Sequence, residues 1–197
     1  MRVLPKGRLL APVLVFLFAY LFSLFFWIQV KDDYGFIITH ISSWGLEKVK
    51  DVKIEGIKKK DGEYVVTISP ERFKSMLVVD VPVKTSTYTF NAPLTFSIIA
   101  AFFLPLRRRF AEQKRKDINT RILRIYLETV GILIFVHILF VFSLEGERLT
   151  GIMMTRGYED VGVLKLGFWQ FLWGFVDNMV IRFEPFLIGA YLYFRGR

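Results

Sequence analysis

The strongest constraint on the fold is a long apolar run near the N-terminus. From Leu9 to Val30 no side chain is ionisable apart from tyrosine, and the run is bounded by Arg8 and Lys31. As an α-helix it would be about 33 Å long, enough to cross a hydrocarbon layer of roughly 30 Å. It ends in Phe25-Phe26-Trp27-Ile28 rather than in the small residues of a cleavage site. We therefore predict an uncleaved signal anchor that forms the first membrane span.

The composition extends this conclusion to the whole chain. Its 197 residues are 53% hydrophobic and 17% aromatic, with 21 Phe and a mean hydropathy of +0.41, which is too apolar for a soluble domain of this size. The absence of Cys excludes disulfides, thiolate metal sites, a Cys nucleophile and a lipidated Cys. The sequence thus predicts an integral membrane protein.

Three further apolar runs follow, and with the first they predict four transmembrane α-helices. They cover Ala92–Leu106, Ile125–Leu144 and part of Leu166–Phe194. The run from Ala92 is short, and snorkelling of the arginines that follow it would complete the span. The predicted boundaries are 1–30 for the N-terminal tail and first span, 31–90 for an extracytoplasmic domain, 91–106 for the second span, 107–124 for a basic connector, 125–144 for the third span, 145–165 for an extracytoplasmic loop, and 166–197 for the fourth span and C-terminus.

The segment 31–90 has mixed charge and short strand-like runs, which predict a small α+β domain. Alternating apolar residues on both sides of Asp61-Gly62 predict a β-hairpin over Val52–Ile68. Ser69-Pro70-Glu71 has the residue types that open a short helix, and Met76–Val83 reads as a further strand. A domain of about 60 residues buries little core, so we expect it to lean on the bilayer, on other loops of the chain or on a partner.

The distribution of Lys and Arg predicts the orientation. Three lie before the first span, eight in the connector Arg107–Arg124 and two at the C-terminus, against three in the loop Glu145–Lys165. We therefore expect both termini and the connector in the cytoplasm and the α+β domain outside it. The absence of an Asn-x-Ser/Thr sequon is compatible with a bacterial inner membrane.

The formal charge of +9 comes mainly from the connector and the termini. The connector carries Arg107, Arg108, Arg109, Lys114, Arg115, Lys116, Arg121 and Arg124. A basic run beside a membrane span is explained by topology and by contact with anionic lipid. No aromatic stacking platform accompanies it, so we predict membrane lipid and not nucleic acid as its partner.

Ionisable residues inside the predicted spans are the first candidates for function, because burying them in a membrane is costly. His137 in the third span and Arg182 and Glu184 in the fourth lie at similar depths. We predict that they form one polar contact between the two helices. Such a contact either only orients the helices or serves proton transfer or a substrate.

Other local features predict structure rather than chemistry. Glu128 follows Arg124 by four residues, which predicts an ion pair on one helix. Asn91 is placed to cap a helix that starts at Ala92. Pro185 predicts a bend in the fourth span, because it cannot donate a hydrogen bond to the preceding turn.

The sequence contains almost no candidate catalytic or metal-binding groups. His40 and His137 are the two histidines and lie on different segments, so a His-based metal site lacks ligands. Ser42 and Ser43 near His40 have no carboxylate to orient a nucleophilic triad, and no phosphate-cradling Gly loop occurs. We predict no catalytic residue, no cofactor and no metal.

The layout resembles the exosortase H-associated membrane proteins, small bacterial proteins with an N-terminal span, an external β-rich segment and further spans. The segment Tyr88–Leu94 and the helix exit Leu104–Arg109 resemble the Asn-Pro-Leu entry and basic exit of that family, although Ala92 interrupts the motif here. Pro185 in the last span is a further similarity. The resemblance implies a protein that accompanies a membrane transpeptidase acting on exported proteins with C-terminal sorting tails. The chain is not that peptidase, since the family enzyme relies on Cys.

Three functional hypotheses follow. The first is a non-enzymatic accessory or scaffold protein whose helices hold the external domain against a membrane-protein partner. The second is a small transporter or proton-linked membrane enzyme that uses His137, Arg182 and Glu184. The third is a supernumerary subunit of a respiratory complex.

Overall fold

The computed structural model describes residues 7–70, 78–113, 117–156 and 162–196. The chain divides into two compact units. Unit 1 comprises Met1–Val30, Phe90–Leu133 and Phe183–Arg197, and unit 2 comprises Lys31–Thr89 and Ile134–Arg182. The helices α1 and α4 contribute to both units, and each unit is described by itself below.

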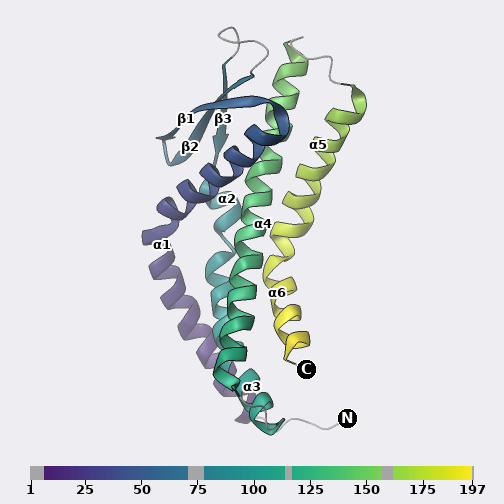
Figure 1. Ribbon diagram of the computed structural model, residues 1–197. Helices are drawn as coiled ribbons and strands as arrows, with labels where there is room; N and C mark the ends of the chain where they lie inside the picture. The colour runs from purple at the N-terminus through teal and green to yellow at the C-terminus, as the bar shows by residue number, and fades with distance from the viewer. Residues whose placement is uncertain (1–6, 71–77, 114–116, 157–161, 197) are drawn as a thin grey trace. The chain divides into compact units, whose positions relative to one another are not determined.

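Three helical segments are long and apolar enough to cross a membrane: Leu10–Lys50, Thr85–Glu112 and Ile118–Thr155. They correspond to α1 (Gly7–Lys50), to α2 (Thr85–Thr89) with α3 (Ala92–Glu112), and to α4 (Ile118–Thr155). Figure 1 shows α1 and α4 as the long helices of the chain. The prediction of a membrane protein with several apolar helices is therefore confirmed at this level.

The predicted fourth span, within Leu166–Phe194, is divided into shorter elements. α5 (Val163–Phe175) is followed by a π-helix (Val176–Ile181) and by α6 (Arg182–Arg195), and none of these elements reaches 18 residues. Pro185 has no N–H with which to bond the carbonyl of Ile181, and Ile181 is the last residue of the π-helix. A fourth span stays a prediction.

Two helices continue far beyond the apolar runs that predicted them. α1 ends at Lys50 rather than near Val30. α4 ends at Thr155, so the prediction of a loop over Glu145–Lys165 is wrong for residues 145–155, which are helical. α1 has 44 residues, a length of about 66 Å, roughly twice the hydrocarbon thickness. The extensions are helical because each presents an apolar face that is buried in unit 2. Their mean hydropathy is similar to that of a loop, so hydropathy alone does not identify them as helices.

The small sheet of unit 2 is antiparallel, with β1 (Val52–Lys60), β2 (Glu63–Pro70) and β3 (Val79–Val83) in the order β1-β2-β3. The predicted hairpin is confirmed, with Asp61 and Gly62 at φ 51° and 80° in its turn.

The elements predicted after the hairpin are only partly found. The helix predicted to open at Ser69-Pro70 is wrong for these residues, because they end β2 and pair with Lys53 and Val52. Glu71 lies outside the described residues. The strand predicted over Met76–Val83 is confirmed for Val79–Val83, and Met76 and Leu77 also lie outside the described part.

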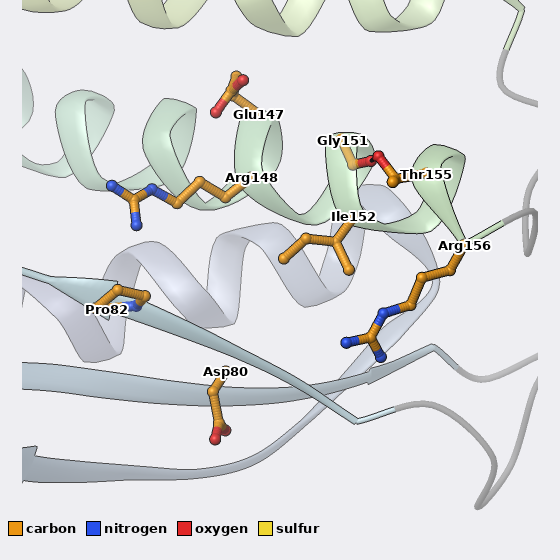
Figure 2. Close-up of a pocket in the computed structure, with 8 residues that line it drawn as sticks. All are labelled: Asp80, Pro82, Glu147, Arg148, Gly151, Ile152, Thr155 and Arg156. Carbon is orange, nitrogen blue, oxygen red and sulfur yellow. Dashed lines mark hydrogen bonds between the residues drawn. The ribbon is translucent and has the colours of Figure 1, made fainter.

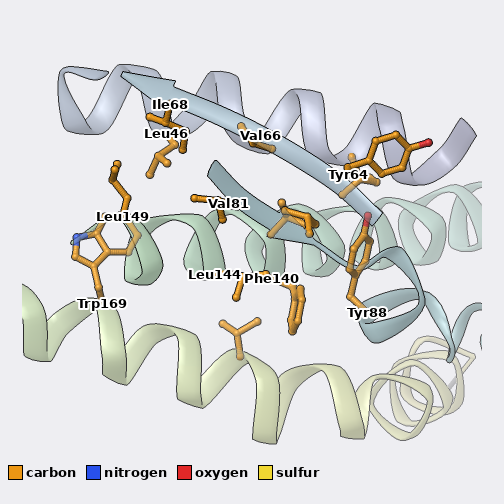
Figure 3. Packing of buried hydrophobic residues seen from close by; sticks show 14 of the residues in the cluster. Leu46, Tyr64, Val66, Ile68, Val81, Tyr88, Phe140, Leu144, Leu149 and Trp169 are labelled. Carbon is orange, nitrogen blue, oxygen red and sulfur yellow. The ribbon is translucent and has the colours of Figure 1, made fainter. Parts of the chain in front are cut away.

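One face of the sheet packs on α1 and α4. Figure 3 shows this core, and its members include Ile38 and Leu46 of α1, Phe140, Leu144 and Leu149 of α4, and Tyr64, Val66, Ile68, Val79, Val81 and Val83 of the sheet. The small domain thus acquires its core from the two long helices, which explains how so few β residues form a stable layer.

The connection from α1 to the sheet is a single residue. α1 ends at Lys50 and β1 begins at Val52. Asp51 between them has φ 50°, in the left-handed region that ends helices. Lys59 and Tyr64 of the hairpin return to α1: the Lys59 ammonium lies 2.7 Å from Asp32 Oδ2, and the Tyr64 hydroxyl donates to the Asp32 carbonyl at 2.8 Å.

These contacts predict a loss of stability in alkali. The hydrogen bond to Asp32 raises the pKa of Lys59 above its usual 10.5, and burial raises the pKa of Tyr64 above its usual 10.0. The unfolded chain therefore releases these protons at lower pH, so the stabilisation is complete below about pH 10 and is lost as the pH rises through the folded-state values. We expect the thermal midpoint of unfolding in detergent to fall above that pH and Tyr64→Phe to reduce the fall. An equal fall in both proteins would contradict the tyrosine contribution.

Unit 1 is helical and has its own core. Ile99, Leu106 and Phe110 of α3 pack with Ile122, Ile125 and Leu133 of α4 and with Ile188 and Leu192 of α6. α3 begins at Ala92 as predicted, but the Asn91 side chain makes no capping hydrogen bond. In the apolar N-terminal segment of α1 most large side chains are exposed, Phe18 and Phe22 at 72% each, as expected for a helix that faces lipid.

Candidate functional site

The residues of the predicted intramembrane contact have separate surroundings. His137 belongs to unit 2, is fully buried, and has its Nδ1 2.7 Å from the hydroxyl of Tyr34 on α1. Glu184 belongs to unit 1, is 1% exposed and accepts a hydrogen bond from Thr95 Oγ1 at 2.9 Å. Arg182 is exposed. The three-residue contact stays a prediction.

Within unit 2, His137 is the first member of a polar seam between α1 and α4. The seam comprises Tyr34 with His137, Ser42 with the Ile138 carbonyl at 3.1 Å, Ser43 with Glu145 Oε1 at 2.7 Å, and Lys50 with the Gly146 carbonyl at 3.4 Å. Residue numbers rise along both helices from one pair to the next, so these segments run parallel. Because the hydrogen bonds need defined positions on both helices, the seam fixes their register.

Glu145 is the most unusual member of the seam. Its side chain has no exposed surface, and Ser43 donates its hydrogen bond to Oε1. Oε2 has no hydrogen-bond partner among the described residues. A buried carboxyl group with a single partner costs stability. Sequence reasoning missed it because the apolar run of the third span ends at Leu144, and Glu145 was therefore expected in a loop.

The seam ends at a junction of three helices. The Lys50 ammonium also bonds the Thr150 hydroxyl and lies 5.0 Å from the ring centroid of Trp169 on α5. The ring of Trp169 in turn packs against Gly146 of α4 so closely that a Cβ there would overlap it. Lys50, Gly146 and Trp169 thus join α1, α4 and α5 at one point.

A pocket of about 470 Å³ lies beside this part of α4. Its lining includes Asp80 and Pro82 of β3, Arg148 and Ile152 of α4, and Arg156, which directly follows that helix. Figure 2 shows Ile152 of α4 and Arg156, at the end of that helix, extending toward the strand that carries Asp80 and Pro82. The mixed charges and the open shape suit a protein surface contact better than an enclosed substrate site.

The predicted basic residues are only partly described. Arg107, Arg108 and Arg109 lie in the last turns of α3, and the first two are exposed. Lys114, Arg115 and Lys116 lie outside the described residues. The predicted ion pair is confirmed, with Arg124 Nε 2.9 Å from Glu128 Oε1.

No protein-family model matches the chain, and neither the curated proteins nor the solved structures compared with it gave a match. Among the residues described, no group of three or more His, Asp or Glu side chains is placed to hold a metal ion.

Proposed function

We propose that the chain is a non-enzymatic accessory or scaffold protein of a bacterial inner membrane. In this proposal α5 and α6 together form a fourth span, both termini and the basic connector are cytoplasmic, and unit 2 lies outside the cytoplasm. The parallel course of α1 and α4 in unit 2 supports this topology, which gives the first and third spans the same direction.

The observation that carries the proposal is an exposed apolar stripe on α1 in unit 2. Ile37, Ile41 and Trp44 are 53%, 40% and 59% exposed. They follow one another at helical spacing, and the charged residues Asp33 and Lys48 bound the stripe at both ends on the same side. An exposed apolar patch with a polar rim marks an interaction surface.

The opposite face of the same helix holds the stripe in place. Ile38, Ser42 and Leu46 are buried against α4 and the sheet. A partner helix or strand would therefore meet a preorganised surface and lose little conformational freedom in ordering it. The partner we propose is a membrane protein, and the family resemblance favours an exosortase-type peptidase.

Site-specific photo-crosslinking in the native host at native expression levels tests this function. A photoreactive amino acid at Ile41 or Trp44 is expected to capture one membrane protein, whereas the same residue at Val49 is not. Val49 is a matched control, because it is 64% exposed and apolar but lies on another side of the same helix. Equal yields at all three positions, or a chain that remains alone, would contradict the proposal. A respiratory subunit as the captured protein would favour the third hypothesis.

A further inference from the structure

A second pocket, of about 390 Å³, lies in unit 1 where α3 ends, α4 begins and α6 ends. α3 contributes Phe110, α4 contributes Arg121, Arg124 and Ile125, and α6 contributes Arg195. Three guanidinium groups from two helices therefore line one cavity. Asp117 is the carboxylate in its lining, so cationic groups predominate.

A shared carboxylate outside the lining positions two of these arginines. Glu128 Oε1 lies 2.9 Å from Arg124 Nε, and Glu128 Oε2 lies 3.4 Å from Arg195 Nε. The hydroxyl of Tyr191 donates to the same carboxylate. Arg124 donates to Glu128 through Nε, whereas Arg195 meets it through Nε and also through Nη2, which lies 3.4 Å from Oε1. A guanidinium group has five N–H donors, so both arginines keep donors beyond these contacts.

Arg121 is the uncompensated charge of this pocket. Its side chain is exposed and makes no hydrogen bond or ion pair with any residue that the structure describes. A guanidinium group without an ion pair among the described residues, placed beside two preorganised arginines, is suited to an anionic ligand.

The pocket also has an apolar side. Phe110 and Ile125 are 6% and 5% exposed and belong to the core of unit 1. One turn beyond Leu123 on α4, Leu127 is 64% exposed, and the apolar run of this helix begins at Ile125. The pocket therefore lies where the polar end of a candidate span meets its apolar part, the level of lipid headgroups.

We propose that this pocket binds the phosphate group of an anionic phospholipid. Arg121, Arg124 and Arg195 would hold the phosphate, and an acyl chain would lie along the exposed apolar side of α4. The phosphate is the shared chemistry of a lipid headgroup and of free phosphate, and the apolar side favours the lipid. The inference depends on the membrane setting but not on the accessory role proposed above.

Native mass spectrometry of the full chain in mild detergent tests the site. Phosphatidylglycerol and phosphatidylcholine would be added in separate series, with inorganic phosphate as a third series. We expect retention of phosphatidylglycerol and a roughly tenfold lower affinity for it in Arg121→Gln, the loss expected for a charge-assisted contact. Arg121 is the residue of choice because replacing it leaves the Glu128 pairs intact.

Arg108→Gln is the matched control. Arg108 is an exposed arginine of the same basic region that does not line the pocket, so we expect its affinity to change less than about twofold. Equal losses of affinity in both variants would show that general surface charge binds the lipid, and would contradict a specific site in this pocket. Equal retention of phosphatidylcholine, or competition by inorganic phosphate at the lipid concentration, would overturn the lipid as ligand. Crosslinking at Ile41 is unaffected by either result, so the two proposals fail separately.

Discussion

Gly146→Ala is expected to lower the free energy of unfolding by about 3 kcal/mol, the upper range for overpacking a core. A Cβ at this position would lie 2.7 Å from Cη2 of Trp169 and still closer to two other ring carbons. Trp169 is 5% exposed and packs on Phe142 with ring centroids 5.4 Å apart, so the rigid indole cannot move aside without losing that contact and the approach of Lys50. Urea or thermal unfolding in detergent, followed by the tryptophan signal, measures the change.

Gly151→Ala is the matched control. Gly151 lies on the same helix, and a Cβ there would meet nothing within 4 Å. Since alanine is the better helix former, this variant is expected to gain up to about 1 kcal/mol. Similar losses in the two variants would mean that the close approach of Trp169 to α4 does not stabilise unit 2.

Ser43→Ala is expected to cost about 2 kcal/mol, because it removes the one hydrogen bond described for the buried Glu145 carboxyl group. Glu145→Met should be neutral or stabilising, since an apolar side chain of similar size replaces a poorly partnered acid. In the Glu145→Met background Ser43→Ala should then cost less than about 0.5 kcal/mol. A double-mutant cycle of unfolding free energies measures this coupling.

Ser42→Ala provides the control for that cycle. Ser42 lies next to Ser43 on α1 and donates to the backbone carbonyls of Ile38 and Ile138, not to Glu145. Its cost should be the same in both backgrounds. If Ser43→Ala costs the same in both as well, Glu145 is not coupled to Ser43.

The hairpin and the apolar helices could be predicted because their signals are local. Asp61-Gly62 and the alternation of Tyr64, Val66 and Ile68 indicate a turn and a buried strand face without reference to the rest of the chain. Hydropathy likewise finds a run such as Leu9–Val30, because every residue in it contributes to the same sum.

The helix extensions could not be predicted in this way, because their apolar faces are buried by the sheet rather than by lipid. In α4 the run Ile125–Leu144 continues from the unit 1 core into the unit 2 core, where Phe140 and Val141 are at most 2% exposed. Hydropathy treats both environments alike and places the end of the span at Leu144. Glu145 was missed for the same reason. The available signal was the absence of Pro between Val30 and Lys50.

The sequence indicated the basic pocket only as a cluster of positive charges near the start of α4. Arg121 and Arg124 were recognised as part of a basic connector, but Arg195 lies 71 residues after Arg124 in the sequence. Their meeting depends on α6 packing against the start of α4. A count of charges along the chain cannot predict a tertiary contact of this kind.

The single residue between α1 and β1 has a mechanical consequence. A flexible linker would let the hairpin keep its orientation while the helix turned, but Asp51 leaves only two backbone torsions between them. The salt bridge of Lys59 to Asp32 ties the far end of the hairpin to the same helix. Helix and hairpin are therefore expected to move as one rigid element, so that a rotation of α1, or its translation along its axis, also displaces the tip of the hairpin.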